Sequence, residues 1–176
     1  MNIRRKWHMP NKNTFDIKPI GDLIYRNVKG ISIDPFANKN RIATHCNDID
    51  PQYDCEFKMN AIDFLKRWDT ESIDVVLFDP PYSPRQVSEC YKSLDMTVNM
   101  QTTQASFWGD MKKEIGRIVK PGGKVITCGW NSGGIGRKNG FDIDEILIVA
   151  HGGWHNDTIV TVDVKTRDLF SEVEVE

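Results

Sequence analysis

The sequence lacks any run of about 20 apolar residues that could cross a bilayer. The basic residues at positions 4–6 have no apolar segment behind them, so no leader peptide is indicated. No Cys-x-x-Cys spacing occurs, and free thiols in a reducing compartment are expected for Cys46, Cys55, Cys90 and Cys128. These absences predict a soluble, cytoplasmic protein. At 176 residues the chain is long enough for one hydrophobic core.

A strong net charge is also missing, because the formal total is only −2. The charges are nevertheless unevenly distributed. Residues 1–41 contain nine Lys or Arg against three Asp or Glu, a balance of +6, and the remainder contains 14 against 22, or −8. The basic segment suits a phosphate backbone, but a solvated tail explains it equally well. We expect residues 1–14 to form a flexible basic arm, 15–166 a single domain and 167–176 an acidic tail.

Apolar residues alternate between two periods along the chain. Helical spacing is found at residues 17–28, 87–94 and 107–119, and short apolar runs typical of strands lie at 31–36, 42–46, 72–79 and 125–130. Strands that alternate with helices predict a mostly parallel sheet. Phe141–Val149 and Thr158–Val164 predict a closing antiparallel hairpin. Its connection contains His151 and His155, but without a helix face to hold both we expect no metal site.

The chain is organised around the strand Ser72–Phe78 and the tetrapeptide that follows it, Asp79-Pro80-Pro81-Tyr82. Prolines cannot donate to a sheet ladder, so the strand must end at Asp79. The tetrapeptide therefore lies at the carboxyl edge of the sheet, where α/β proteins bind ligands. A carboxylate, a carbonyl fixed in direction by two prolines, and an aromatic face together suit a planar amine on an unstacked base.

Asp79-Pro80-Pro81-Tyr82 resembles the signature of the S-adenosylmethionine-dependent amino-methyltransferases. The Asp form is most similar to the DNA adenine-N6 branch of the small kind found in bacteria and their phages. The resemblance implies an α/β, Rossmann-like methyltransferase fold with a mostly parallel seven-stranded sheet and an antiparallel C-terminal hairpin. It also implies methyl transfer from S-adenosyl-L-methionine to the N6 amine of a flipped-out adenine in DNA, with catalytic roles for Asp79, Pro80, Pro81 and Tyr82.

The same resemblance implies cofactor-binding residues at Asp34, Pro35, Phe36, Ala37, Asp48, Asn60, Ala61 and Asp79. Asp48 is the first choice for the acid that binds the ribose hydroxyls, with Asp50 the second. Asn60 equally suits a helix N-cap. Two features depart from the family. Asn38–Arg41 replaces its glycine-rich turn, and the next apolar stretch follows too soon for a crossover helix.

For substrate binding the resemblance implies Tyr82, Arg85 and Trp130, although a lone arginine is more often plain surface and Trp130 also suits the core. The chain has no room for a separate recognition domain. Recognition is therefore expected from residues 83–104, from Asn131–Gly140, from a homodimer or from a separate specificity subunit. Three alternatives remain open. They are an RNA or protein-glutamine amino-methyltransferase, a cytosine-N4 enzyme, and a catalytically silent subunit that binds nucleic acid or a partner.

Overall fold

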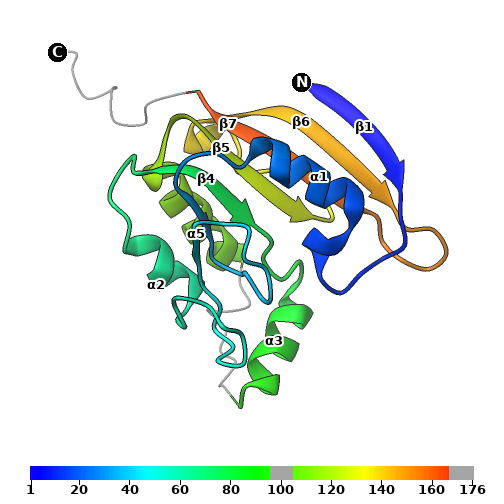
Figure 1. Ribbon diagram of the computed structural model, residues 1–176, viewed down its shortest axis with the longest axis horizontal. Helices are drawn as coiled ribbons and strands as arrows, with labels where there is room; N and C mark the ends of the chain where they lie inside the picture. The colour runs from blue at the N-terminus through cyan, green and yellow to red at the C-terminus, as the bar shows by residue number, and fades with distance from the viewer. Residues whose placement is uncertain (96–104, 167–176) are drawn as a thin grey trace.

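A computed structural model describes residues 1–95 and 105–166. Within these ranges seven strands form one sheet in the order β1-β6-β7-β5-β4-β2-β3 (Figure 1). The strands are β1 (Asn2–Trp7), β2 (Ser32–Asp34), β3 (His45–Cys46), β4 (Ile73–Phe78), β5 (Val119–Gly129), β6 (Phe141–Ala150) and β7 (Thr158–Lys165). All neighbours are parallel except β7, which is antiparallel to β5 and β6. The predicted fold class is thus confirmed, including the closing hairpin.

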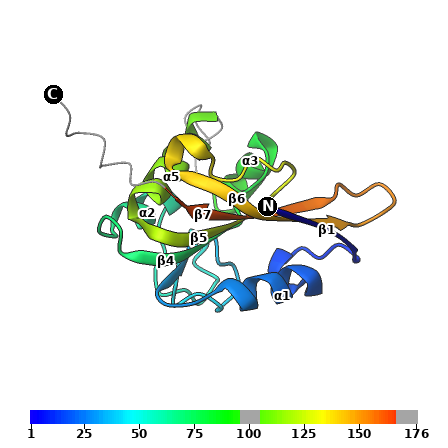
Figure 2. The ribbon, with the colours of Figure 1, turned by 90° about the horizontal axis from the view of Figure 1, so that it is seen from above.

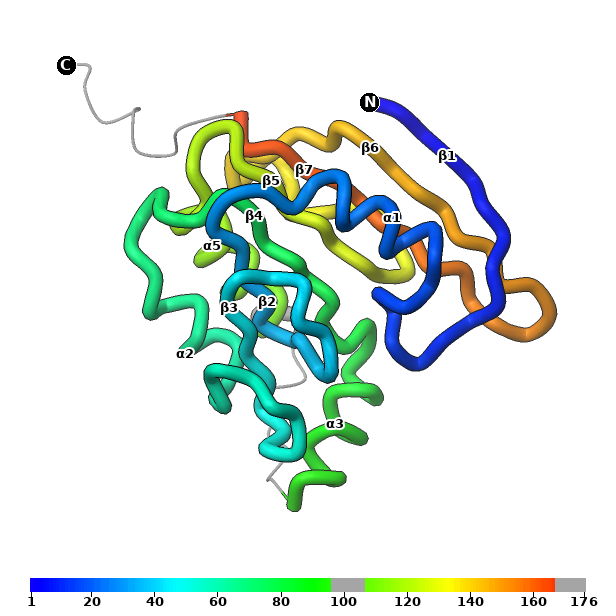
Figure 3. Tube along the Cα trace, viewed as in Figure 1, coloured from blue at the N-terminus to red at the C-terminus, as the bar shows by residue number. Residues whose placement is uncertain are grey.

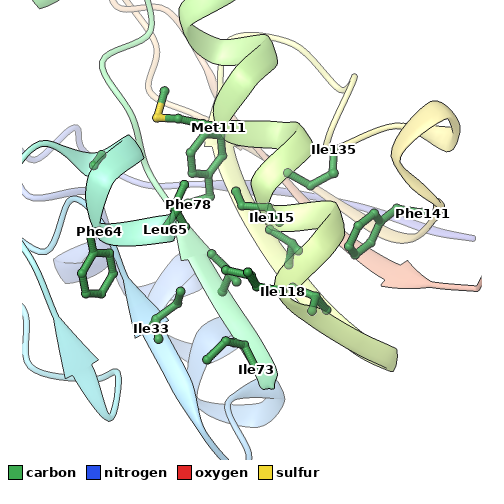
Figure 4. Close-up of a cluster of buried hydrophobic side chains, with 14 residues drawn as sticks. Ile33, Phe64, Leu65, Ile73, Phe78, Met111, Ile115, Ile118, Ile135 and Phe141 are labelled. Carbon is green, nitrogen blue, oxygen red and sulfur yellow. The ribbon is translucent and has the colours of Figure 1, made fainter. Parts of the chain in front are cut away.

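Helices cover both faces of the sheet (Figure 2). They are α1 (Lys18–Asn27), α2 (Ala61–Lys66), α3 (Pro84–Ser93) and α5 (Ala105–Ile118), with short 3-10 helices η1 (Thr14–Asp16) and η2 (Arg137–Asn139). Helix α1 packs on one face, where its apolar stripe shares a cluster with Val75 and Leu77 of β4. On the other face, Met111 and Ile115 of α5 belong to a cluster with Phe78 (Figure 4). Burial on both faces explains the apolar run Val75–Phe78 of β4.

The N-terminal residues differ from the expected flexible arm. Residues 2–7 form β1, which pairs in parallel with β6 from Asn2 opposite Glu145 to Trp7 opposite Ala150. The buried carboxylate of Glu145 forms ion pairs with Arg4 of β1 at 3.3 Å and with Arg26 of α1 at 2.6 Å. These ion pairs connect the edge strand β1 to helix α1. The chain then turns back through η1 into α1 (Figure 3).

The connection between β2 and β3 contains turns in place of a helix. The two strands are nevertheless parallel and adjacent, with Ile33 opposite His45, so the crossover is shortened and the order of strands is kept. The side chain of Asn47 stabilises this connection by donating to the carbonyls of Pro35 at 3.1 Å and Met59 at 3.0 Å. Hydrogen bonds between Ser32 and Thr44 add to this support at the start of the connection.

The expected turn at Lys120–Lys124 lies inside β5 as a bulge. Val119 pairs with Ile73, and the next pair joins Lys124 to Val75, so that residues 120–123 are looped out. Gly122 has a φ of 77°, which glycine adopts without strain. The expected polar stretch Thr97–Gln104 and the tail 167–176 lie outside the described residues. No helix in the described ranges is long and apolar enough to cross a membrane.

Candidate active site

The carboxyl ends of four neighbouring strands meet at one cavity of about 740 Å³. We call it the strand-end cavity. Its volume lies within the range of pockets that bind small molecules. One side, next to β4 and β5, contains Asp79–Tyr82 and Trp130, and the other, next to β2 and β3, contains Pro35, Phe36, Asn38, Asp48, Asn60 and Ala61. The sheet thus brings most of the predicted site residues together.

The Asp79–Tyr82 turn is held by two helices. The indole Nε1 of Trp108 on α5 donates to the Pro81 carbonyl at 3.0 Å, and Gln86 on α3 accepts from the Tyr82 backbone N–H at 2.6 Å. Ser83 caps α3 by accepting from the Gln86 N–H at 3.3 Å, so the turn leads directly into the helix. The Pro80 carbonyl has no donor among the described residues. Pro80 itself is buried and belongs to the lining of the cavity.

Inside the turn the Tyr82 hydroxyl donates to Oδ1 of Asp79 at 2.5 Å. Burial raises the pKa of the Asp79 carboxyl, and hydrogen bonds from the side chains of Tyr82 and Thr14 oppose that rise. Burial together with the neighbouring Asp79 charge raises the pKa of the Tyr82 hydroxyl, which therefore stays a donor. Thr14 belongs to η1, so the N-terminal segment contributes a side chain to the predicted catalytic turn.

Trp130 stands at the end of β5 beside Tyr82. The two ring centroids are 5.6 Å apart with an interplanar angle of 71°, so the rings form a corner. Trp130 is 43 % exposed and lines the cavity, which places it at the site and not in the core. A flat ligand that stacks on one ring of this corner meets the edge of the other.

The predicted loop Asp34–Ala37 divides into two parts. Pro35 and Phe36 line the cavity, whereas Asp34 and Ala37 lie behind it. Asp34 is only 1 % exposed, and its carboxylate accepts from the Phe36 N–H at 3.0 Å. Burial raises its pKa well above the ordinary value, and the negative charges of Asp79 and Asp48 add to the rise. Asp34 therefore stabilises the conformation of this loop without lining the cavity.

Asp48 fastens the loop that replaces the glycine-rich turn. Its Oδ2 accepts from the Asn38 N–H at 2.8 Å, and its Oδ1 accepts from the Asp50 N–H at 2.9 Å. Asn38 has a φ of 52°, a left-handed conformation that asparagine tolerates better than most residues. Asn38 thus supplies the backbone conformation for which a glycine is usually needed. Burial raises the pKa of Asp48.

Asn60 is the helix N-cap that the sequence predicted, and its role in cofactor binding stays a prediction. Its Oδ1 accepts from the Ile62 N–H at 3.1 Å and caps α2, while Nδ2 donates to the Tyr91 hydroxyl of α3 at 3.0 Å. Asn60 and Ala61 both line the cavity. The amide therefore joins α2 to α3 across the β2–β3 side.

Two predicted substrate-binding regions lie elsewhere. Arg85 is exposed, pairs with Glu89 at 2.8 Å and does not line the cavity. The segment 131–140 does not line it either, because its backbone is fixed to the buried Asp163, whose Oδ1 accepts from the Ile135 N–H at 3.2 Å. Sequence reasoning missed two segments that do line the cavity, Pro10–Thr14 and Trp154–Asn156. Basic charge before residue 13 and a tryptophan after two glycines were their only signals.

No protein-family model and no curated protein matches the sequence. Solved structures do resemble the fold. TrmN from Thermus thermophilus superposes with a TM-score of 0.55 at 16 % identity over 85 % of this chain, which spans about half (49 %) of TrmN. The 1,6-didemethyltoxoflavin-N1-methyltransferase of Burkholderia thailandensis, solved with 1,6-didemethyltoxoflavin and S-adenosylhomocysteine, gives 0.57 at 11 % identity, covering 85 % of this chain and 78 % of that one.

The putative methylase HI0767 of Haemophilus influenzae matches over 90 % of this chain and 92 % of its own, with a TM-score of 0.51 and 10 % identity. At such identities a likeness establishes architecture alone. The sheet order, the helices on both faces and the closing antiparallel pair agree with that architecture. The chain therefore has the α/β fold of these methyltransferases.

Proposed function

We propose that this chain transfers a methyl group from S-adenosylmethionine to the N6 amine of an adenine base in DNA. One observation carries the proposal. The Asp79-Pro80-Pro81-Tyr82 turn lines the strand-end cavity at the end of the central strand β4, and no donor in the described part of the chain bonds the Pro80 carbonyl. The methyltransferase-like fold supports the class of reaction, and the turn supports an amine as the methyl acceptor.

The β2–β3 side of the cavity fits the cofactor. The Asp48 carboxylate suits two ribose hydroxyls, because each of its oxygens has a second lone pair beyond the one used by the backbone. Asn60 and the backbone of Ala61 offer polar groups to an adenine ring. Asp48 and Asp79 both line the cavity, and their carboxylates, when ionised, favour a positively charged ligand between them. When bound, S-adenosylmethionine supplies the electrophilic methyl group.

The β4–β5 side prepares the amine. The lone pair of an adenine N6 is delocalised into the ring, so the nitrogen is a poor nucleophile. The Asp79 carboxylate and the Pro80 carbonyl accept its two hydrogens, which favours a pyramidal nitrogen with a free lone pair. The corner formed by Tyr82 and Trp130 holds a base whose flipping costs a few kcal/mol. The surplus proton on the product nitrogen passes to water.

A second candidate is a catalytically silent subunit that keeps the fold and binds nucleic acid or a partner. The loop after β2 favours it, because this loop lacks glycine and satisfies its own polar groups. The Asn40 N–H donates to the Ala37 carbonyl at 2.7 Å, and the Arg41 guanidinium donates to the Asn38 carbonyl at 2.9 Å. A loop closed by its own bonds has fewer donors left for a cofactor.

Two measurements test the proposal. Calorimetric titration with S-adenosylmethionine, alone and with DNA, separates the enzyme from the silent subunit, because absence of binding in both cases excludes the enzyme. Transfer of labelled methyl to DNA, RNA and protein then identifies the substrate class, with Asp79→Ala as the inactive control. We expect label on DNA in N6-methyl-2′-deoxyadenosine after nucleoside analysis. Label only on RNA or on glutamine would replace adenine in DNA as the substrate, and full activity of Asp79→Ala would refute the mechanism.

A further inference from the structure

The rim of the strand-end cavity includes two segments that lie far apart in the sequence. We define the rim as residues 7–14, which begin at the last residue of β1, together with the β6–β7 connection, residues 151–157. Lys12, Thr14, Trp154 and His155 line the same cavity as the Asp79–Tyr82 turn. Figure 1 shows this connection, in orange, beside the end of β1, in blue. Any polymer that delivers a base to the turn must therefore pass the rim.

The base of the connection is fixed. The buried His151 has its Nδ1 at 2.8 Å from the His8 carbonyl and its Nε2 at 2.8 Å from the Thr158 hydroxyl. Because a carbonyl can only accept, Nδ1 donates to it, while Nε2 and the Thr158 hydroxyl share a second hydrogen bond. The His8 N–H donates to the Ala150 carbonyl at 3.1 Å, so both rim segments are joined at this point. The rim is one connected structure.

The tip of the connection is exposed. Gly152 and Gly153 have φ values of 70° and 58°, which let the chain turn sharply. Trp154 follows them and is fully exposed, so it contributes little to the stability of the fold. Trp7 lies close by, since its Nε1 is 3.4 Å from the position that a Cβ on Gly152 would occupy. Exposed indoles offer large flat faces, and every nucleobase can stack on such a face.

The charge of the N-terminal segment, which leads from β1 into the rim, indicates the kind of partner. Residues 1–15 contain Arg4, Arg5, Lys6 and Lys12 and no acidic residue. Arg5, Lys6 and Lys12 are exposed, and no carboxylate in the described part of the chain lies within ion-pair distance of them. The rim itself contains Asp157 besides Lys12, but a second copy that docked through the same N-terminal segment would bring Arg5 and Lys6 close to their own copies. A phosphate backbone complements them.

We infer that the rim binds the nucleic-acid strand that carries the target base, with Trp154 stacked on a base next to the target and Lys12 on a phosphate. This inference rests on the proposed function for the identity of the target. It assigns recognition to the N-terminal segment and the β6–β7 connection, in place of Arg85 and the segment 131–140. Stacking there keeps the strand next to the turn while the target base occupies the corner of Tyr82 and Trp130.

The test measures binding of a fluorescein-labelled, adenine-containing oligonucleotide, both single-stranded and duplex, without cofactor. Trp154→Ala should weaken binding roughly tenfold, and Trp154→Phe should retain part of the affinity. Lys12→Gln should lower the slope of log affinity against log salt by about one phosphate contact. Two variants are the matched controls. Tyr25→Ala changes an aromatic residue on α1 that is 70 % exposed and does not line the cavity. Lys29→Gln changes an exposed lysine just before β2, at the amino ends of the strands and away from the cavity.

The outcomes separate this inference from the proposed function. Binding that depends on Trp154 supports the rim even if no methyl is transferred. Methyl transfer to DNA with the same KM for DNA in Trp154→Ala and the parent protein refutes the rim and leaves the proposed function intact. Sedimentation provides a further check. If Trp154→Ala dissociates a dimer and binds the oligonucleotide as tightly as the parent, the rim is a contact between copies and the inference is wrong.

Discussion

The two sides of the strand-end cavity are built in different ways. The β4–β5 side is stiffened covalently, because two consecutive prolines fix the backbone. The β2–β3 side is stiffened by hydrogen bonds, because Asp48 and Asn60 each use both ends of their side chains within the protein. On the β4–β5 side the covalent geometry of the prolines sets the direction of the backbone, whereas on the β2–β3 side a ligand must share hydrogen bonds that already exist. We call the β4–β5 side, which is proposed to bind the amine, the prepared side, and the β2–β3 side, which is proposed to bind the cofactor, the self-satisfied side.

The largest expected effect comes from changing one atom on the prepared side. Asp79→Asn replaces a carboxylate oxygen with an NH₂ group that donates and cannot accept. We expect methyl transfer to fall by about 10²–10³-fold, the loss typical of removing one preorganised electrostatic contact. The melting temperature should not fall, because the variant removes a buried charge whose pKa is already raised. A variant with the parent rate and an intact fold would show that the amine does not bind at this turn.

An intermediate effect is expected on the self-satisfied side, where Asp48 and Asp50 form a matched pair. Asp48→Ala removes the proposed ribose acceptor and the bond that fastens Asn38, so the Kd for S-adenosylmethionine should rise roughly 10- to 100-fold. Asp50→Ala should change it by much less, because the carboxylate of Asp50 contacts only Gln52 among the described residues. Calorimetry measures both. If Asp50→Ala has the larger effect, the two roles are reversed.

The smallest expected effect is a shift in pH dependence. Asp79 must be ionised to accept from the amine, so kcat/KM falls as the pH drops through its pKa, which burial raises above the ordinary value of about 4. Tyr82→Phe keeps an aromatic face and removes a hydrogen bond that lowers this pKa. The acidic limb of the profile should therefore move to higher pH.

Tyr91→Phe is the control for this shift, because its hydroxyl bonds Asn60 on the opposite side of the cavity. The pH profile of kcat/KM for methyl transfer measures both variants, and Tyr91→Phe should leave the acidic limb in place. An acidic limb that stays fixed or moves to lower pH in Tyr82→Phe would mean that Asp79 does not set it.

Local chemistry predicted the prepared side well and the rim poorly. Two prolines after an apolar run determine where β4 ends, and this needs no knowledge of distant residues. β1 has no such signature, because all six of its side chains are exposed and follow no periodicity. Its position is set by pairing with β6 at the other end of the chain. The loop at Asn38 lies between these cases. The missing glycines were visible in the sequence. The hydrogen bond from the Asn38 N–H to Asp48 was not, because it joins residues ten positions apart.

The pairing of β1 with β6 has a consequence for the order in which the site is assembled. Asn2 pairs with Glu145, so this contact closes a loop that contains most of the chain. Contacts between residues so far apart in the sequence form slowly. During synthesis the Asp79 turn leaves the ribosome well before β6 does. Until β6 emerges, Thr14 and Lys12 have no anchored strand on their N-terminal side. The chain therefore completes the mouth of its cavity only after the central strand β4 has been synthesised.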